Sequence, residues 1–405
     1  MRIAWVLYGE LTQRTGGTIY DAEVIAGLRR AGDEVTVLSL APARAGGAGV
    51  EGVEGVASLV ARVRGLAPDV VVGDELCFRE LAILFARLHG AGTRRVLLVH
   101  HLTRWESEVP RQRRRVHGVL ESLAMRASDL IITTSETTRR RVRAEGARAP
   151  IVAVLPGADR LPAGARGAAS GRGHVVRLAF LGAIVARKRV LELVRAFADG
   201  ADGADRADRA DRADGANGAN GAELVLVGST TRDPRYVREV LELIARRGLT
   251  ARVTLLGEVD EIGAARALAA SDVLVMPSSL EGYGIAATEA IHAGVPVIAA
   301  RAQGLEEALA RCPAACMFAD DEPALARAIR RFATERGLRA AMREGAIEAR
   351  PSLPTWSACA SAFRATLGVL CPQQPVVPLA NSDKILHDRS LRRGRLLRRG
   401  RTLAF

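Results

Sequence analysis

Residues 271–300 contain a strand–loop–helix–strand pattern that constrains the fold of the whole chain. Residues 272–276 and 295–299 are apolar runs of strand length, and a Ser/Gly-rich turn between them leads into a helix over residues 285–292, which Gly294 ends. Two buried strands joined through a helix predict a parallel β-α-β crossover. The turn then lies at the carboxyl edge of a parallel sheet, where open α/β sheets bind their ligands.

The turn before this helix combines acidic side chains with free backbone amides. Glu281 lies in the loop and Glu289 follows eight positions later, and the residues that begin the helix are Gly282, Tyr283, Gly284 and Ile285. A helix N-terminus attracts an anion, because its unsatisfied N–H groups and the positive pole of the helix dipole point the same way. A nucleotide sugar would place its pyrophosphate there and hydroxyl groups on the two carboxylates. The spacing alone leaves structural capping as an alternative role for Glu289.

The segments E-G-Y-G-I-A-A-T-E, at 281–289, and A-G-V-P-V-I-A, at 293–299, resemble the E-x7-E signature of the family 4 retaining glycosyltransferases. That family has the GT-B fold, an α/β architecture in which two Rossmann-like, doubly wound parallel-sheet domains face a cleft. The resemblance covers residues 1–370. It implies metal-independent transfer of a hexose from a nucleoside diphosphate sugar, UDP- or GDP-linked, to an acceptor hydroxyl with retention of configuration. In these terms Glu281 holds sugar hydroxyls and Glu289 holds the ribose.

Two sets of alternating strands and helices predict two domains. Residues 1–165 are expected to form an N-terminal Rossmann-like domain on the acceptor side, and residues 175–350 a C-terminal Rossmann-like domain that binds the nucleotide sugar. Residues 351–370 follow a proline break as an amphipathic helix, which in the resembled family crosses back to the first domain. A triplet repeat at residues 199–222 has no apolar residue larger than alanine, which predicts a disordered insertion.

The formal charge of +13 is mostly a property of the C-terminal tail. Residues 384–405 hold Lys384 and seven arginines against Asp388 alone, so this segment contributes +7 of the +13. Blocks of like charge are usually disordered, which predicts a basic, disordered tail over residues 371–405. We therefore expect no nucleic-acid partner, and we expect at most a peripheral contact with an anionic membrane.

The five cysteines are scattered and odd in number, which predicts free thiols rather than a metal site or disulfides. No apolar run reaches the length of about 18 residues that spans a bilayer. Because residues 1–7 read as a strand and not as a signal peptide, we expect a cytoplasmic protein that contacts the inner face of the membrane at most peripherally.

A second charged feature lies where a strand meets a helix in the segment F-L-G-A-I-V-A-R-K-R-V, residues 180–190. Cations at a helix N-terminus oppose the helix dipole and call for a bound anion or solvent. The chain has only two lysines, so Lys188 beside Arg187 indicates that a compact ammonium is needed as a point charge on phosphate. In the resembled family this segment reads G-R-x-x-x-R-K-G. Lys188 matches it, but Ala183 stands at the position of the first arginine, so Arg187 or another cation would have to substitute.

Further candidate residues lie at strand ends of the first domain. Gly17 in the T-G-G-T loop matches the family's cleft-facing glycine loop, although a flexible turn is the alternative. His100 and His101 end a strand, and family members carry a cleft histidine near the sugar, but the sequence does not distinguish which of the two matches. Asp74 and Glu75 follow another strand, and an exposed helix start is the expected role for both, with contact to the acceptor as the alternative.

Two further segments are assigned from strand and helix patterns. L-L-G-E-V-D ends a strand, and the backbone of Gly257 and Val259 is expected to read the nucleotide base, as it does in the resembled family. A long helix is expected over residues 105–127. Its arginines are expected on a solvated surface, with contact to anionic lipid as the alternative; they are Arg111, Arg113, Arg114 and Arg115.

The predicted function is therefore a retaining hexosyltransferase that needs no cofactor or metal beyond its donor substrate. The residues expected to be catalytic are Glu281, Lys188, His100 and His101. The partner is a nucleotide sugar, and the acceptor stays open among a lipid, a polysaccharide and a small molecule. Two alternatives remain, namely a nucleotide-sugar epimerase of GT-B fold and a non-catalytic basic binding protein, which the tail and Ala183 favour.

Overall fold

The computed structural model describes residues 1–40, 51–162, 175–210 and 221–371. Residues 1–371 form one compact unit. The predicted end of the first domain at residue 165 and the predicted basic tail from residue 372 onward lie outside the described residues. Among the described helices, none combines the length and the apolar composition needed to cross a bilayer.

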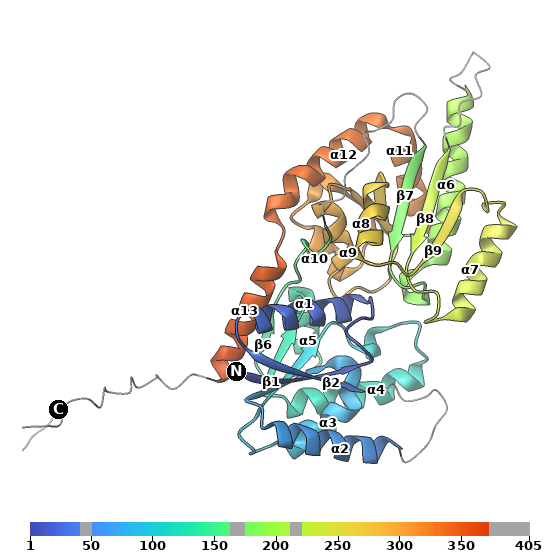
Figure 1. Ribbon diagram of the computed structural model, residues 1–405. Helices are drawn as coiled ribbons and strands as arrows, with labels where there is room; N and C mark the ends of the chain where they lie inside the picture. The colour runs from blue at the N-terminus through green and yellow to red at the C-terminus, as the bar shows by residue number, and fades with distance from the viewer. Residues whose placement is uncertain (41–50, 163–174, 211–220, 372–405) are drawn as a thin grey trace, which may run out of the picture. The chain divides into compact units, whose positions relative to one another are not determined.

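The first half of the compact unit is built on a parallel six-stranded sheet with the strand order β2-β1-β3-β4-β5-β6 (Figure 1). Its strands are β1 (Arg2–Tyr8), β2 (Glu34–Leu40), β3 (Val70–Asp74), β4 (Arg94–Val99), β5 (Leu130–Thr133) and β6 (Ile151–Ala153). The order reverses between β1 and β3, since the chain goes from β1 to β2 on one side and then returns to β3 on the other. Such a switch point leaves a crevice at the carboxyl ends of the strands.

Helices cover both faces of the first sheet, because its strands are apolar on both sides. Helix α1 (Gly16–Arg30) packs on one face, where Tyr20 and Leu28 join the apolar core. The other face carries residues of four helices in one core. These are α2 (Glu51–Leu66), α3 (Phe78–Arg87), α4 (Arg111–Ala127) and α5 (Glu136–Ala144).

A second parallel six-stranded sheet has the strand order β12-β11-β10-β7-β8-β9. Its strands are β7 (Val176–Leu181), β8 (Ala222–Val227), β9 (Val253–Gly257), β10 (Val273–Met276), β11 (Val297–Ala300) and β12 (Cys316–Ala319). Read from β9, this order is that of the dinucleotide-binding Rossmann fold, with the switch point between β7 and β10. The prediction of two doubly wound parallel sheets is confirmed.

Two apolar layers also enclose the second sheet. One layer contains α6 (Val190–Ala210), α7 (Pro234–Arg246) and α11 (Glu322–Thr334). The opposite layer contains α8 (Glu261–Ala269), α9 (Ile285–His292), α10 (Gln303–Leu309) and α12 (Arg336–Ala349).

The last described helix, α13 (Trp356–Leu370), packs against α1 on the first sheet although it follows the second (Figure 1). Phe363 is fully buried there and its ring lies 5.4 Å from that of Trp5. Arg364 adds a 2.7 Å hydrogen bond to Asp33. The chain therefore passes from the first sheet to the second and back.

Side chains and loops join the two halves near the first sheet's carboxyl edge. Glu307 of α10 accepts hydrogen bonds from the amides of Glu136 and Thr137 at 2.7 and 2.6 Å, which satisfies free donors at the N-terminus of α5. Gly282 lies so close to the carbonyl oxygen of His100 that a Cβ atom would approach it to 2.2 Å. Only glycine fits at this crossing.

Two element predictions are wrong. The helix expected over residues 105–127 begins at Arg111, because Pro110 precedes it as N-cap; residues Thr103–Trp105 form only a short 3-10 turn. The repeat expected to be disordered from residue 199 is helical as far as Ala210, since alanine and arginine favour helix even where no apolar core is available. The remainder of the repeat, residues 211–220, lies outside the described residues.

Candidate active site

A cavity of about 600 Å³ lies where the carboxyl edges of both sheets meet. It is lined by residues that follow β1, β3 and β4 in the first half, and β7, β8, β9 and β10 in the second. Both switch points therefore open into the same space, which is the position where doubly wound sheets bind ligands.

Lys188 and Glu281 form a buried ion pair in the wall of this cavity. The lysine Nζ donates a hydrogen bond to Glu281 Oε1, and the two side chains are only 11% and 9% exposed. Burial opposes ionisation of Glu281, but the nearby Lys188 and Arg187 charges hold the pKa of this carboxyl below its ordinary value. Burial lowers the pKa of Lys188, which Glu281 counteracts. The structure thus brings together two predicted site residues that lie 93 positions apart in the sequence.

The loop after β10 ends at the N-terminus of α9, beside this ion pair. Gly284 is the N-cap and has φ of +105°, a conformation that suits glycine, and no side chain caps the helix. Gly282, Tyr283, Gly284 and Ile285 all line the cavity. An anion in the cavity would therefore meet an uncapped helix end, as the sequence predicted.

Glu289 lies on α9 beyond its first turn and is 3% exposed. It does not cap the helix, so the capping alternative is wrong. Arg160 Nε donates a hydrogen bond of 2.8 Å to Glu289 Oε1, and Arg160 Nη2 forms an ion pair with the same oxygen at 2.8 Å. Burial raises the pKa of Glu289 to about 7, although Arg160 acts in the opposite direction.

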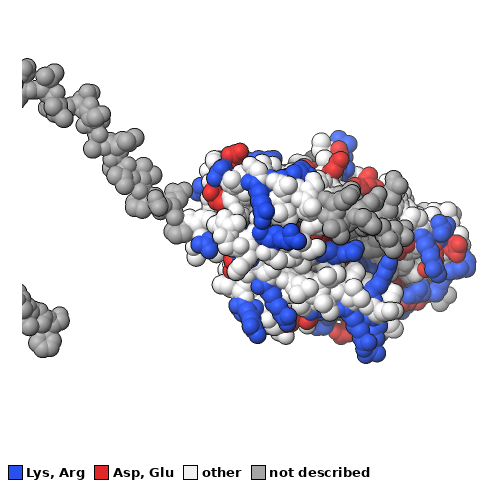
Figure 2. All heavy atoms as spheres, turned by 90° about the horizontal axis from the view of Figure 1, so that it is seen from below, with Lys and Arg blue, Asp and Glu red and all other residues white. Residues whose placement is uncertain are grey.

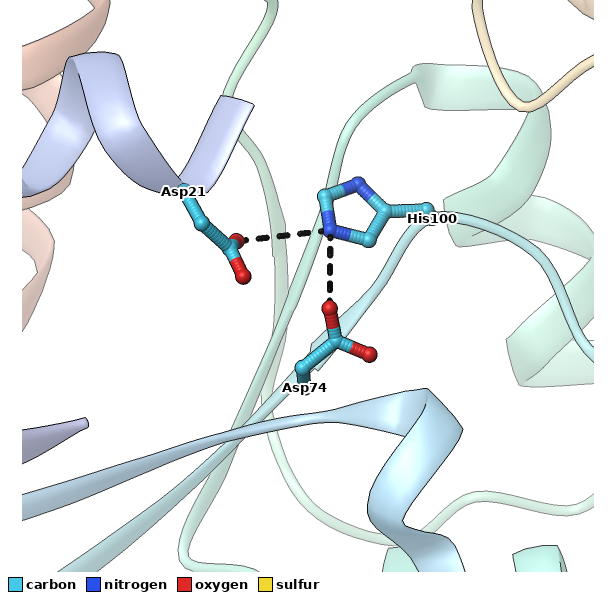
Figure 3. Close-up of side chains that lie close together, drawn as sticks. All are labelled: Asp21, Asp74 and His100. Carbon is cyan, nitrogen blue, oxygen red and sulfur yellow. Dashed lines mark ion pairs between the residues drawn. The ribbon is translucent and has the colours of Figure 1, made fainter. Parts of the chain in front are cut away.

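His100 lies between two buried aspartates at the cavity wall (Figure 3). Its Nε2 is 3.5 Å from Asp21 Oδ1 and 3.7 Å from Asp74 Oδ2, and the Asp21 and Asp74 residues are 0% and 2% exposed. Neither Asp21 oxygen nor His100 Nε2 has a hydrogen-bond partner within the described residues. Burial raises the pKa of both carboxyl groups and lowers the pKa of His100.

The expected exposed role of Asp74 and Glu75 is wrong. Asp74 Oδ1 accepts the amide of Leu76 at 2.7 Å and caps the short turn η1 (Glu75–Cys77). Glu75 is 3% exposed and accepts the amide of His100 at 2.9 Å. Both carboxylates are buried because β3 and β4 are central strands, whose ends lie beneath the loops that enclose the cavity.

His100, Asp21 and Asp74 are also the group of residues in the described part of the chain that could hold a metal ion. One ligand atom from each lies within 4.8 Å of the others. Two buried carboxylates with no arginine or lysine against them have to be neutralised, either by protons or by a cation. Their raised pKa values indicate that protons do so near neutral pH.

His101 also reaches the cavity, through a different set of contacts. Its Nε2 lies 2.7 Å from Glu106 Oε1, and the same oxygen is 3.9 Å from Arg187 Nε. Although burial opposes it, His101 and Arg187 lower the pKa of Glu106. Arg187 is therefore held at the cavity by Glu106 and by the carbonyl of Leu280.

The structure identifies cavity cations that the sequence reading missed. Ala183 lines the cavity and, as an alanine, brings no charge to it. Three arginines also line the cavity, namely Arg232, Arg160 and Arg14. Burial lowers the pKa of Arg232, and the nearby Arg187 lowers it further. Arg232 follows β8, so its place after a strand end is the sequence signal that predicts it, as it is for His100.

Among the remaining predicted residues, Gly17 and Val259 line the cavity, with Gly17 beside the His100 ring. Gly257 does not line it. Its carbonyl accepts the amide of Gly228 at 2.8 Å, so this oxygen is bonded to the neighbouring loop rather than available to a base.

Both halves of the chain match families of glycosyltransferase domains. Residues 15–158 match the glycosyl transferase 4-like domain, and residues 176–335 match glycosyl transferases group 1. Together with the cavity between the two sheets, these matches support a glycosyltransferase of the GT-B type.

Solved structures show the same fold. A sucrose-phosphate synthase from Thermosynechococcus elongatus is 19% identical with a TM-score of 0.71, and the match covers 91% of this chain and 98% of that one. The Anabaena protein HepE in complex with UDP-glucose is 19% identical with a TM-score of 0.70, over 91% and 100% of the two chains. The prediction of a GT-B fold is confirmed.

Curated relatives are similar over shorter segments. A D-inositol 3-phosphate glycosyltransferase from Streptomyces avermitilis is 31% identical over 247 residues, which are 58% of this chain and 51% of the relative. A GDP-mannose-dependent alpha-(1-6)-phosphatidylinositol dimannoside mannosyltransferase from Mycobacterium tuberculosis is 33% identical over 114 residues, 27% of this chain and 28% of the relative. The chain thus spans about half of the length of these relatives or less.

The buried aspartate pair predicts a pH-dependent stability. Because folding raises the pKa of Asp74 and Asp21, the folded state keeps protons that the unfolded state releases above about pH 4. The free energy of unfolding should therefore fall as the pH rises toward neutrality, by about 1.4 kcal/mol for each unit of pKa shift. Asp74→Asn retains the Oδ1 acceptor, removes one titrating group and relieves Asp21, so this fall should become smaller.

Urea unfolding at pH 5 and at pH 7.5 measures this difference. Asp320→Asn, which alters an exposed carboxylate, should keep the slope of the unaltered protein. An unchanged slope in Asp74→Asn would contradict the assignment of buried, proton-holding carboxyl groups beside His100.

Proposed function

We propose that this chain is a retaining, metal-independent hexosyltransferase that uses a nucleoside diphosphate sugar, UDP- or GDP-linked, and an acceptor hydroxyl. The observation that carries the proposal is the pairing of Lys188 with Glu281 beside the uncapped N-terminus of α9 inside the cavity. A lysine, a carboxylate and free helix amides in one cavity can hold a phosphate and a hydroxyl-bearing group next to each other.

In the proposed reaction, the diphosphate leaves toward the end of α9. The bond between the anomeric carbon and the phosphate oxygen breaks, and negative charge grows on the diphosphate. The acceptor oxygen bonds the anomeric carbon, and its proton passes to the departing diphosphate. The amides of Gly284 and Ile285 and the ammonium of Lys188 are fixed in advance at a buried wall, so they can stabilise this charge without reorganising. Arg187 and Arg232 add cations at the same cavity, where Ala183 provides none.

The sugar would lie over Glu281, with the acceptor on the same face as the departing diphosphate. Glu281 accepts the sugar's hydroxyl hydrogens through Oε2, the carboxylate oxygen that Lys188 does not bond, and Glu289 accepts those of the ribose. His100 and His101 line the other side of the cavity and would orient the sugar and acceptor. Holding both reactants in place supplies much of the rate enhancement in such a reaction.

The relatives narrow the choice of substrates to test. HepE is bound to UDP-glucose, and one relative is named as dependent on GDP-mannose. Another relative is named for D-inositol 3-phosphate. Arg14 lines this cavity from the first half, where a cation suits a phosphorylated acceptor. We therefore propose UDP-glucose and GDP-mannose as first donors and an inositol phosphate as first acceptor.

Two substitutions test the proposed roles. Glu281→Gln and Lys188→Met should each reduce hexose transfer about 10²- to 10³-fold, because each removes a preorganised charge next to the reacting atoms. Thermal unfolding must show that each variant is folded, since breaking a buried ion pair costs about 3–5 kcal/mol. Arg235→Ala, at a side chain that is 84% exposed, is the control and should retain full turnover.

The same assay separates the alternatives. A chelator should leave turnover unchanged if no metal takes part. Isomerisation of the donor without an acceptor would indicate an epimerase. Unchanged turnover in both Glu281→Gln and Lys188→Met would refute the proposed site.

We also propose that α4 contacts anionic lipid. Arg111, Arg113 and Arg115 are exposed near its start, and none of them has an acidic partner within the described residues. Apolar side chains of the same helix are also exposed, namely Val116 (57%), Val119 (62%) and Leu123 (46%). Figure 2, which views the molecule from below, shows basic side chains spread over this side with fewer acidic ones. A cationic helix with an exposed apolar stripe suits a lipid interface.

Vesicle co-sedimentation tests this contact. Arg113→Gln combined with Arg115→Gln should weaken binding to vesicles of phosphatidylglycerol and phosphatidylcholine about 30-fold, because each charge near an anionic surface contributes about 1 kcal/mol. Arg246→Gln, which removes an exposed charge on α7, should bind like the unaltered protein. Equal binding by the double variant would contradict the contact.

A further inference from the structure

Arg160 is a buried arginine in the segment that follows β6, and it lines the cavity together with Glu289. Its side chain is 9% exposed. Its Nε donates a hydrogen bond to Glu289 Oε1, its Nη2 lies 2.8 Å from the same oxygen, and its Nη1 donates a 3.2 Å hydrogen bond to Glu261 Oε1 on α8. All three guanidinium nitrogens therefore have carboxylate partners.

These bonds leave one side of Glu289 available. Both short contacts from Arg160 converge on Oε1. Oε2 has no hydrogen-bond partner within the part of the chain that the structure describes, although the residue faces the cavity. A carboxylate oxygen at a cavity wall that has no partner among the described residues is suited to accept hydrogens from a ligand.

We propose that Arg160 is a positioning residue for the nucleotide sugar: it holds Glu289 at Oε1 and thereby fixes Oε2 toward the cavity, where it accepts the hydrogens of the ribose hydroxyls. This inference rests on the proposed function and extends it, because it gives Glu289, the carboxylate proposed to bind the ribose, a fixed partner outside the second sheet. Arg160 does not have to touch the nucleotide sugar, since each of its three guanidinium nitrogens already contacts Glu289 or Glu261.

The opposite interpretation makes a different prediction. If Arg160 only fills the place of a missing ribose, the nucleotide sugar has to displace the Arg160 side chain in order to bind. Removing Arg160 would then strengthen donor binding, whereas removing a positioning residue weakens it.

The charged groups around Glu289 determine how its role depends on pH. Arg160 faces it from the segment after β6, Glu261 from α8 and Glu23 from α1. Burial raises the pKa of Glu289 to about 7, the two glutamates also raise it, and Arg160 lowers it. An ionised Glu289 accepts two hydroxyl hydrogens, so donor affinity should increase as the pH rises through about 7.

Calorimetric titration between pH 5.5 and 8.5 tests the proposal, with UDP-glucose and GDP-mannose as probes. Nucleotide sugars are preferable to free diphosphates, because a terminal phosphate monoester itself titrates near pH 6. In Arg160→Gln, the midpoint of the pH profile should move upward by about one unit or more, since a neighbouring arginine lowers a carboxyl pKa by about one to three units. A shift of about one unit corresponds to a roughly fivefold loss of affinity at pH 7 that is largely recovered at pH 8.5.

Three matched variants distinguish positioning from a general loss of charge or fold. Arg160→Lys keeps the charge and should retain a midpoint near that of the unaltered protein. Glu261→Gln removes a negative neighbour and should move the midpoint downward. Arg232→Gln removes another cavity cation and should weaken binding at every pH with the midpoint unchanged.

The possible outcomes separate the two proposals. If neither nucleotide sugar binds the unaltered protein, the proposed function fails. If one binds and Arg160→Gln shows the original midpoint or a higher affinity, the positioning role is refuted while the function stands. If Arg160→Gln does not fold, the comparison of Arg160→Lys, with an expected unchanged midpoint, and Glu261→Gln, with an expected lower midpoint, decides; identical profiles in both would refute the positioning role.

Discussion

The buried pairing of Lys188 with Glu281 is the interaction on which the cavity depends. Each charge alone would be costly to bury, and together they are stable enough to remain ionised within a wall that is mostly shielded from water. The pair joins the turn after β7 to the loop after β10, across the switch point of the second sheet. The sheet order thus brings a lysine, a carboxylate and a helix N-terminus to one place.

The other buried acidic groups of the cavity also need compensation for burial, and they obtain it in different ways. Glu289 is compensated by Arg160, which reaches it from the first half of the chain. Asp21 and Asp74 have no cation, so protons provide the compensation and His100 stays neutral between them. Lys188 therefore keeps Glu281 ionised for a polar ligand, while Asp21 and Asp74 present a largely uncharged wall around His100.

The sequence predicted those features that are local in the chain. The β-α-β unit around Glu281, the uncapped turn from Gly282 and the isolated Lys188 could be recognised because short-range patterns determine strands, turns and helix starts. Burial at strand ends was predicted wrongly for Asp74, because it depends on which strands become central. Arg160 and Asp21 were missed because their partners lie 129 and 79 positions away and only the folded chain brings them together.

A structure of the protein with bound nucleotide tests the central claim most directly. Crystals grown with the nucleoside diphosphate of the donor should show the diphosphate between Lys188 Nζ and the amides at Gly284 and Ile285, with the ribose hydroxyls on Glu289. A nucleotide bound elsewhere, or a diphosphate that contacts neither Lys188 nor the N-terminus of α9, would contradict the account.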